Sequence, residues 1–167
     1  AVRLPIHGGS IRLTFGKRRA PTAAVAALLA EEHALGLHAL AYYARFGERV
    51  AEFRDRARAM IGDLVGSGAR IAAYGAPAKG TILLNYLGID DRQIAFAADR
   101  NPVKQGRYIP GAGIPIVSPD RIEQDMPDVL LLLPWNFRDE ILRQQRPYLE
   151  RGGKVLVPIP NLEMIGA

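Results

Sequence analysis

The stretch "AAYGAPAKGTILLNYLGI", residues 72–89, starts as an apolar run, passes through a loop with a glycine at each end, and continues as a helix. A buried strand that turns through glycines into a helix is typical of parallel sheets covered on both faces, and of loops that hold phosphates. The stretch therefore predicts a nucleotide-binding turn in an α/β domain. The spacing of Gly75 and Gly80 decides which nucleotide chemistry fits it.

The same order of strand, loop and helix continues to the end of the chain. Strands are predicted at residues 70–74, 94–99, 114–118, 128–134 and 154–160, and helices at 80–87, at 119–124 behind Ser118 as N-cap, and at 137–152. Strands that alternate with helices form a parallel sheet with right-handed crossovers. Residues 70–160 are therefore predicted to form a small Rossmann-like α/β domain, with a parallel sheet in the order 3-2-1-4-5 and helices on both faces.

Two helices are predicted before this domain. The first follows Thr22 as a possible N-cap and stops at Gly36. The second covers residues 39–65 and is expected to pack on the sheet, and the "GSG" of residues 66–68 ends it. Its apolar residues recur at steps of three and four and pass through Gly47 without a shift. They are Tyr43, Phe46, Val50, Phe53, Ala57, Met60 and Leu64.

"SIRLTF", residues 10–15, alternates apolar and polar side chains, which is the pattern of a strand with one buried face. No hairpin partner is evident nearby, so the strand is interpreted as isolated. Because an unpaired strand exposes backbone N–H and C=O groups, we expect this segment to be disordered or to pair with another molecule.

Composition excludes several classes of protein. The chain has 167 residues, 49% of them hydrophobic, which suits one domain or one domain with a fragment of another. No apolar run approaches the roughly 20 residues of a membrane span, and no export signal is visible. Without cysteine there are no disulfides and no thiolate metal sites. We expect a cytoplasmic protein that does not contact membranes.

The formal charge of +5 comes from basic residues scattered along the chain. The one tight cluster, Lys17, Arg18 and Arg19, lies in a connector before Pro21. Nucleic-acid surfaces combine a basic stripe with a recognition element or stacking aromatics, and neither is evident. The charge therefore favours small anionic ligands over nucleic acid.

The glycine loop does not match the dinucleotide or the Walker pattern. A dinucleotide fingerprint needs Gly-x-Gly-x-x-Gly, whereas Gly75 and Gly80 stand five apart, and Pro77 has no N–H for a phosphate. Asp99 ends the second predicted strand, but aspartate is common there as a turn former. A Walker loop needs Gly-Lys before Ser or Thr, and here Lys79 precedes Gly80. What remains is a helix N-terminus beside a lysine, a site for a phosphate or diphosphate.

Three segments are expected to meet at the carboxyl edge of the sheet, where its strand order reverses. They are "YGAPAKG" after the first strand, "DRNPVKQGRY" after the second and "PWN" after the fourth. Lys79, Lys104 and Arg107 would surround the helix N-terminus, and an arginine can hold a diphosphate through two parallel bonds. Trp135 offers a ring face and Asn136 an amide. A solvated loop, and a tryptophan that only covers the sheet edge, explain the same residues equally well.

Five motifs in register make the chain resemble the C-terminal domain of the sugar C-methyltransferases, over essentially its whole length. They lie at residues 75–80, 99–108, 110–116, 131–136 and 152–160. These enzymes use S-adenosylmethionine to methylate a ring carbon of nucleotide-linked deoxysugars, typically dTDP-4-keto sugars. The resemblance implies a dTDP-sugar as ligand, bound by Gly75, Ala76, Pro77, Ala78, Lys79, Gly80, Asp99, Asn101, Lys104, Gln105, Arg107, Tyr108, Trp135 and Asn136.

The resemblance also implies an arrangement of domains. Residues 1–20 would be the end of a preceding methyltransferase domain, residues 21–66 connecting helices, and residues 67–167 the Rossmann-like domain. Because the chain has no cysteine and no glycine-rich cofactor strand before His7, we expect it to lack the zinc-binding and S-adenosylmethionine-binding parts. It would then hold no cofactor, carry no catalytic residue and be inactive alone, and it would pack on its own methyltransferase domain in the full-length protein.

The three histidines are well separated and predict no metal site. His33 is interpreted as a hydrogen-bonded core residue and His38 as a surface residue, while His7 could approach the sugar in a full-length enzyme. Two functions remain open. The chain is either the substrate-binding domain of a nucleotide-sugar C-methyltransferase, or a stand-alone, non-catalytic module of Rossmann type that binds a nucleotide or nucleotide sugar.

Overall fold

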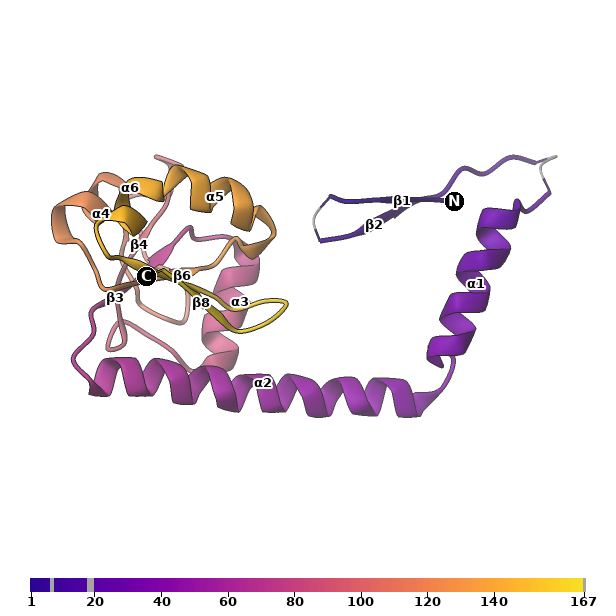
Figure 1. Ribbon diagram of the computed structural model, residues 1–167, viewed down its shortest axis with the longest axis horizontal. Coiled ribbons are helices and arrows are strands. Elements are labelled where there is room, and N and C mark those ends of the chain that lie inside the picture. Colours follow the sequence, from indigo (N-terminus) through magenta and orange to yellow (C-terminus); the bar gives the residue numbers. More distant parts are fainter. Residues whose placement is uncertain (7, 18–19, 167) are drawn as a thin grey trace. The chain divides into compact units, whose positions relative to one another are not determined.

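The computed structural model describes residues 1–6, 8–17 and 20–166, and the chain divides into two compact units, Ala1–Glu52 and Phe53–Ala167 (Figure 1). The first unit contains strands β1 (Val2–Leu4) and β2 (Ser10–Arg12), helix α1 (Ala23–Leu35) and the beginning of helix α2 (Leu40–Gly66). The second unit contains the end of α2 and everything after it. Each unit is described by itself below.

The prediction of an isolated strand at residues 10–15 is wrong. β2 pairs antiparallel with β1, with Val2 opposite Arg12 and Leu4 opposite Ser10. The segment is thus neither disordered nor in need of another molecule to pair with. The partner was missed because a strand of three residues is too short to show a period-2 pattern.

The ends of the two helices agree with the sequence. α1 begins after Thr22, which makes no side-chain capping bond, and it ends at Gly36 in the left-handed conformation with φ 75°. α2 runs through Gly47 and ends at Gly66. Its buried side chains are Ala57 and Ile61. Tyr43 and Phe46 are exposed, so the predicted apolar face is buried only toward the C-terminal end of the helix.

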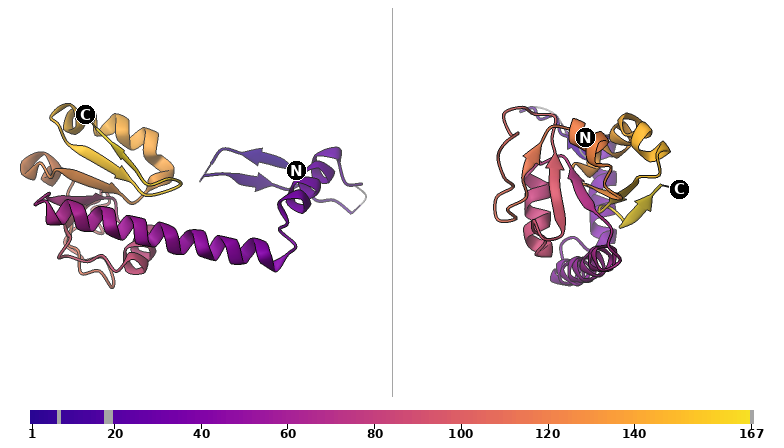
Figure 2. Two further views of the ribbon diagram at one scale, coloured as in Figure 1. Left: turned by 60° about the horizontal axis from the view of Figure 1, so that its bottom comes forward. Right: turned by 90° about the vertical axis from the view of Figure 1, so that its left-hand side faces the viewer.

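A six-stranded sheet forms the centre of the second unit. Its strands are β3 (Ile71–Tyr74), β4 (Ile94–Ala98), β5 (Ile116–Val117), β6 (Val129–Leu132), β7 (Lys154–Val157) and β8 (Glu163–Ile165), in the order β5-β4-β3-β6-β7-β8. All neighbours are parallel except β7 and β8, the antiparallel pair at the C-terminal end in Figure 2. A mixed α/β fold with a mainly parallel sheet is confirmed. The predicted sheet of five strands is incomplete, because β8 adds an antiparallel edge.

Helices cover both faces of this sheet (Figure 1). One core cluster joins the end of α2 and helix α3 (Ala78–Leu87) to the sheet through residues such as Ile61, Leu84 and Leu131. The other joins helices α4 (Asp120–Asp125), α5 (Arg138–Gln144) and α6 (Arg146–Glu150) through residues such as Ile122 and Leu130. Successive residues of β6 therefore point into opposite cores, which explains the unbroken apolar run in the sequence.

Three predicted elements differ in detail. The strand expected at 114–118 shrinks to Ile116–Val117, and α4 has Pro119 rather than Ser118 at its N-cap. The single helix expected at 137–152 is interrupted between α5 and α6. Pro147 explains the interruption, because it has no N–H to donate to the carbonyl four residues earlier. Trp135 and Asn136, expected in a loop, and Phe137, expected to begin that helix, together form the 3-10 turn η1.

In the described part of the chain, no single helix is long and apolar enough to cross a membrane. Only α1 and α2 taken together would meet that test, by length and composition alone.

Candidate functional site

The loops after β3, β4 and β6 meet at the carboxyl edge of the parallel sheet. β3 lies between β4 and β6, where the strand order changes direction and α/β sheets place their ligands. The Gly75 N–H donates to the Ala98 carbonyl at 2.7 Å, and the Leu133 N–H donates to the Tyr74 carbonyl at 3.1 Å. The structure therefore brings these three segments together, as predicted.

Gly75 and Gly80 lie where the backbone packs too closely against the end of β6 to leave room for a side chain. Gly75 has φ 77°, and a Cβ there would lie 2.9 Å from the ring of Pro134. A Cβ on Gly80 would lie 2.8 Å from the Leu133 Cβ. The loop and the first turn of α3 thus approach the end of β6 more closely than a side chain permits. Leu133 and Pro134 form this wall; Pro134 begins the predicted "PWN" segment, whereas only the apolar run that contains Leu133 pointed to it.

The first turn of α3 carries amides that the helix itself cannot satisfy. Pro77 precedes the helix and makes no side-chain cap, and the Thr81 N–H donates to the Pro77 carbonyl at 3.1 Å. The N–H groups of residues 78–80 come before that bond, in the part of a helix that has no intrahelical acceptor. They form the positive end of the helix dipole, where anions are stabilised.

Lys79 connects this helix terminus to η1. Its ammonium lies 4.3 Å from the centre of the Trp135 ring and donates a hydrogen bond to the Asn136 Oδ1. Burial lowers the pKa of Lys79. The structure therefore brings together three residues that the sequence placed in two separate segments.

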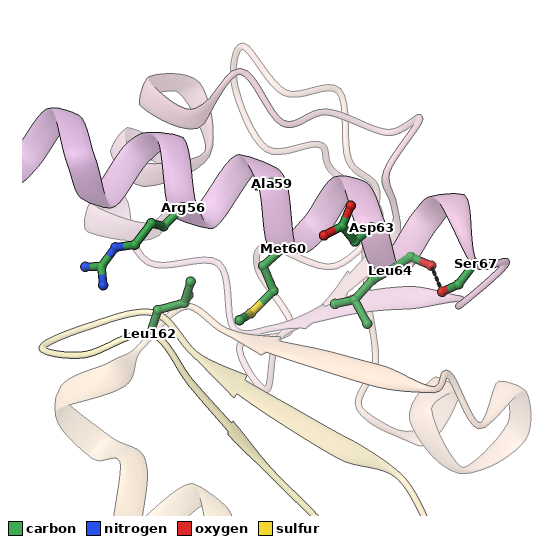
Figure 3. A pocket seen from close by; sticks show the side chains of 7 residues that line it. All are labelled: Arg56, Ala59, Met60, Asp63, Leu64, Ser67 and Leu162. Carbon is green, nitrogen blue, oxygen red and sulfur yellow. Dashed lines mark hydrogen bonds between the residues drawn. The ribbon is translucent and has the colours of Figure 1, made fainter.

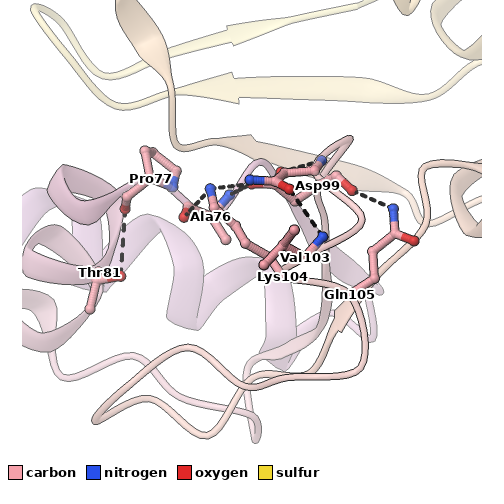
Figure 4. Close-up of polar contacts among 8 residues, drawn as sticks. Ala76, Pro77, Thr81, Asp99, Val103, Lys104 and Gln105 are labelled. Carbon is pink, nitrogen blue, oxygen red and sulfur yellow. Dashed lines mark hydrogen bonds and ion pairs between the residues drawn. The ribbon is translucent and has the colours of Figure 1, made fainter.

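Asp99 joins the loop after β4 to the loop after β3 (Figure 4). Its Oδ2 accepts the Ala76 N–H at 2.7 Å and pairs with the Lys104 ammonium at 2.9 Å, while its Oδ1 accepts the Asn101 N–H at 2.8 Å. Burial acts to raise the pKa of Asp99, but the bonds from Asn101, Lys104 and Ala76 outweigh it, so the pKa lies below its usual value. Asp99 is a turn former, as expected, and also links two loops.

Other predicted site residues bind one another in this network. Lys104 also donates to the Ala76 carbonyl at 3.0 Å, and the Gln105 Nε2 donates to the Asp99 carbonyl at 2.9 Å. The Asn101 Oδ1 accepts the Val103 N–H at 3.0 Å. Both carboxylate oxygens of Asp99 thus already accept hydrogen bonds within the chain, so the carboxylate that a dinucleotide site would use for the ribose hydroxyls holds the two loops together here. The Lys104 ammonium is likewise already paired.

Arg107 and Tyr108 are on the exposed side of the loop after β4. Within the described residues the Arg107 guanidinium makes no hydrogen bond or ion pair, so its five donors remain available to a ligand. Tyr108 is 66% exposed as a residue, and its backbone forms an isolated bridge with Pro115. Of the predicted cations, Lys79 and Arg107 are therefore the two that the Asp99 network does not engage.

The histidines do not behave as predicted in every case. His33 is exposed and stacks on His38, with ring centres 4.4 Å apart, so its interpretation as a core residue is wrong. His38 is exposed, as expected. His7, Arg18 and Arg19 lie outside the described residues. Among the residues that are described, no group of three or more His, Cys, Asp or Glu could hold a metal ion.

A wide groove of about 700 Å³ lies elsewhere in the second unit, between α2 and the connection from β7 to β8 (Figure 3). Met60 and Leu64 point from α2 toward Leu162, and Arg56 and Asp63 lie at its margins. The groove includes Leu162 from the connection after β7, but no residue of the loops after β3, β4 and β6. Its apolar floor offers few donors to a phosphate, whereas the first turn of α3 offers backbone amides and the Lys79 ammonium, so the candidate site lies at Lys79.

Comparison with known proteins identifies the family. The family described as "C-methyltransferase C-terminal domain" matches residues 5–160. C-methyltransferase NovU from Streptomyces niveus is 39% identical over 169 residues, a match that covers 97% of this chain. The chain spans 39% of that relative's length. The motifs at the edge of the sheet lie inside the matched range, and the chain belongs to the C-terminal domain family of the C-methyltransferases.

Proposed function

We propose that this chain binds the nucleotide-sugar substrate of an S-adenosylmethionine-dependent sugar C-methyltransferase. Membership of the C-methyltransferase family supports this assignment, as does a relative named as a C-methyltransferase. The observation that carries it is the position of Lys79, at the N-terminus of α3, with its ammonium over Trp135 and beside Asn136. A cation, free helix amides and an aromatic face together suit a ligand that joins a diphosphate to flat or sugar rings.

In the proposed complex, the diphosphate accepts hydrogen bonds from the amides of residues 78–80 and from Lys79, and it takes the place of Asn136 as the acceptor for that ammonium. Arg107 holds the second phosphate through two parallel bonds. The Trp135 ring then stacks on the sugar or the base, and the released Asn136 amide bonds to its edge. The charges favour a dTDP-sugar over an uncharged sugar.

The remaining parts of the proposal concern the full-length enzyme. Residues 67–167 supply the substrate site and residues 21–66 connect it to a preceding methyltransferase domain, of which residues 1–20 are the end. S-adenosylmethionine and the general base belong to that domain, on which this chain packs, and the protein acts in the cytoplasm.

Calorimetric titration of dTDP tests the substrate site. A hydrogen bond to a charged group contributes about 1.5–3 kcal/mol, so Lys79→Met and Arg107→Ala should each weaken binding by roughly ten- to a hundredfold. Arg107→Lys should recover only part of the loss, because a point charge cannot make two parallel bonds. Lys17→Met is the matched control, since Lys17 is exposed in the first unit. Wild-type affinity in both Lys79→Met and Arg107→Ala would place the diphosphate elsewhere.

A second titration separates the substrate domain from a complete enzyme. S-adenosylmethionine should not bind this chain at micromolar concentrations, and dTDP should. Binding of S-adenosylmethionine without binding of dTDP would contradict the proposal that this chain is the substrate-binding part of the enzyme. Binding of NAD with an affinity equal to that of dTDP would instead favour a general dinucleotide module.

A further inference from the structure

The loop after β3 is held on both sides of one residue. The Ala76 N–H donates to the Asp99 Oδ2 at 2.7 Å, and the Ala76 carbonyl accepts from the Lys104 ammonium at 3.0 Å. Asp99 and Lys104 also pair with each other at 2.9 Å. These three residues close a triangle of hydrogen bonds, which we call the Ala76 clamp. A closed, charge-assisted triangle restricts the backbone more than any single bond in it.

The clamp itself is anchored to the loop after β4. The Asp99 Oδ1 accepts the Asn101 N–H at 2.8 Å, and the Asp99 carbonyl accepts from Gln105 at 2.9 Å. Asp99 is only 9% exposed, so its charge is shielded from water by the residues that it binds. Five residues that the sequence suggested as ligand contacts, Ala76, Asp99, Asn101, Lys104 and Gln105, thus have protein partners already.

Ala76 controls the direction in which α3 begins. Gly75 before it is confined by the Pro134 ring, and Pro77 after it has φ −78°, fixed by its own ring. Gly80 is pressed against Leu133. Only a short segment lies between the clamp and Lys79, so movement of Ala76 would displace the Lys79 backbone as well.

We propose that Asp99 and Lys104 are positioning residues, which hold the loop after β3 so that Lys79 lies over Trp135 and the first amides of α3 face the ligand. Neither side chain contacts the ligand. The placement of Lys79 by the clamp can be tested without a ligand, whereas its consequence for the ligand rests on the proposed binding of a nucleotide sugar. Two separate measurements address these two parts.

The first measurement needs no ligand. Trp135 is the single tryptophan of the chain, so intrinsic fluorescence reports on the cation 4.3 Å from its ring. Lys79→Met defines the spectrum without that cation. The double variant Asp99→Asn/Lys104→Met keeps the net charge of the chain and should shift the emission toward the Lys79→Met spectrum. The matched control is Asp91→Asn/Lys17→Met, which removes the same two charges at exposed positions and should leave the wild-type spectrum.

Circular dichroism establishes whether the double variant is folded, and if it is not, Lys104→Met alone is measured in its place. The single variant Lys104→Arg should keep the wild-type emission that Lys104→Met loses, because its guanidinium can still donate to both Ala76 and Asp99. A folded clamp variant that retains the wild-type spectrum would overturn the positioning role. Failure of Lys104→Arg to keep the emission would count against it as well.

The second measurement titrates dTDP at two salt concentrations. Removing a cation that touches phosphate weakens binding and also reduces its salt dependence, because a screened attraction is lost. Lys79→Met should show both effects. The Asp99→Asn/Lys104→Met variant should bind about tenfold or more weakly, with the reduced salt dependence of Lys79→Met, and adding Lys79→Met to it should weaken binding little further, because both changes remove the same contact. Losses that add in full when Lys79→Met is combined with the clamp variant would make Lys104 a ligand contact of its own and refute the proposal. If wild type does not bind dTDP, the proposed function fails, and the fluorescence result alone decides the positioning role.

Discussion

A single methyl group at Gly80 tests whether α3 really begins against the end of β6. In Gly80→Ala the new Cβ would lie 2.8 Å from the Leu133 Cβ and 3.2 Å from its Cδ1. Leu133 has no exposed surface, so it has no free space into which to move. Overpacking of this kind costs about 1–3 kcal/mol, and alanine in place of glycine in a helix returns at most about 1 kcal/mol. The free energy of unfolding should therefore fall by about 1 kcal/mol.

A loss of that size lowers the melting temperature of a domain of this length by about 4 °C, which differential scanning calorimetry resolves easily. Gly62→Ala is the matched control. Gly62 lies inside α2, and a Cβ there would meet no atom within 4 Å, so this substitution should raise stability by about 0.5–1 kcal/mol. If Gly80→Ala melts above wild type, as Gly62→Ala should, the close contact with Leu133 does not exist.

Three further changes probe the core and its charges. Leu131→Asp places an unpaired charge where 1% of the surface is exposed, so it should unfold the second unit at room temperature; an unchanged thermal melt would contradict burial of β6. Burial raises the pKa of Tyr148 to about 12, above its unfolded value of about 10, so stability present below pH 10 should be lost as the pH rises toward 12. In Tyr148→Phe this loss of stability at alkaline pH should shrink. Urea titration at neutral pH should show about 1–3 kcal/mol less stability, because the hydroxyl that donates to the Pro127 carbonyl at 2.9 Å is gone. Equal pH dependence of the free energy of unfolding above about pH 10 in the two proteins would refute this. The pKa of Asp99 is lowered in the folded chain, so its contribution is present above pH 4 and is lost as the pH falls further; Asp99→Asn should flatten the acid limb of the stability curve, and an unaltered limb would mean that Asp99 is not paired.

The sequence predicted the parts of the fold that have a strong local pattern. Three local patterns are long enough to be recognised. They are the unbroken apolar run of β6, the glycine-bounded turn before α3, and the apolar steps of three and four along α2. β1 and β8 have three residues each, too few for such a pattern, and the alternation at residues 10–15 predicted β2 but not its pairing with β1. Their existence depends on a partner strand, which is a property of the tertiary structure and is only weakly encoded nearby.

The sequence alone also determined where the candidate site lies. Parallel strands end at one edge of a sheet, so the order of strands and helices already brings residues 75–80, 99–108 and 133–136 together. Three of the five family motifs lie in the same segments. This much follows from connectivity, and it needs no knowledge of side-chain positions.

Only the tertiary structure decided what each side chain does there. Lys79 and Lys104 are both lysines in segments that follow neighbouring strands, and the sequence predicts the same role for both, contact with a diphosphate. Lys104 lies 2.9 Å from a buried carboxylate and pairs with it, whereas Lys79 lies over an indole ring beside an amide. The difference arises because the energy of an ammonium depends on which groups lie within a few ångströms of it, and those groups come from strands far apart in the chain.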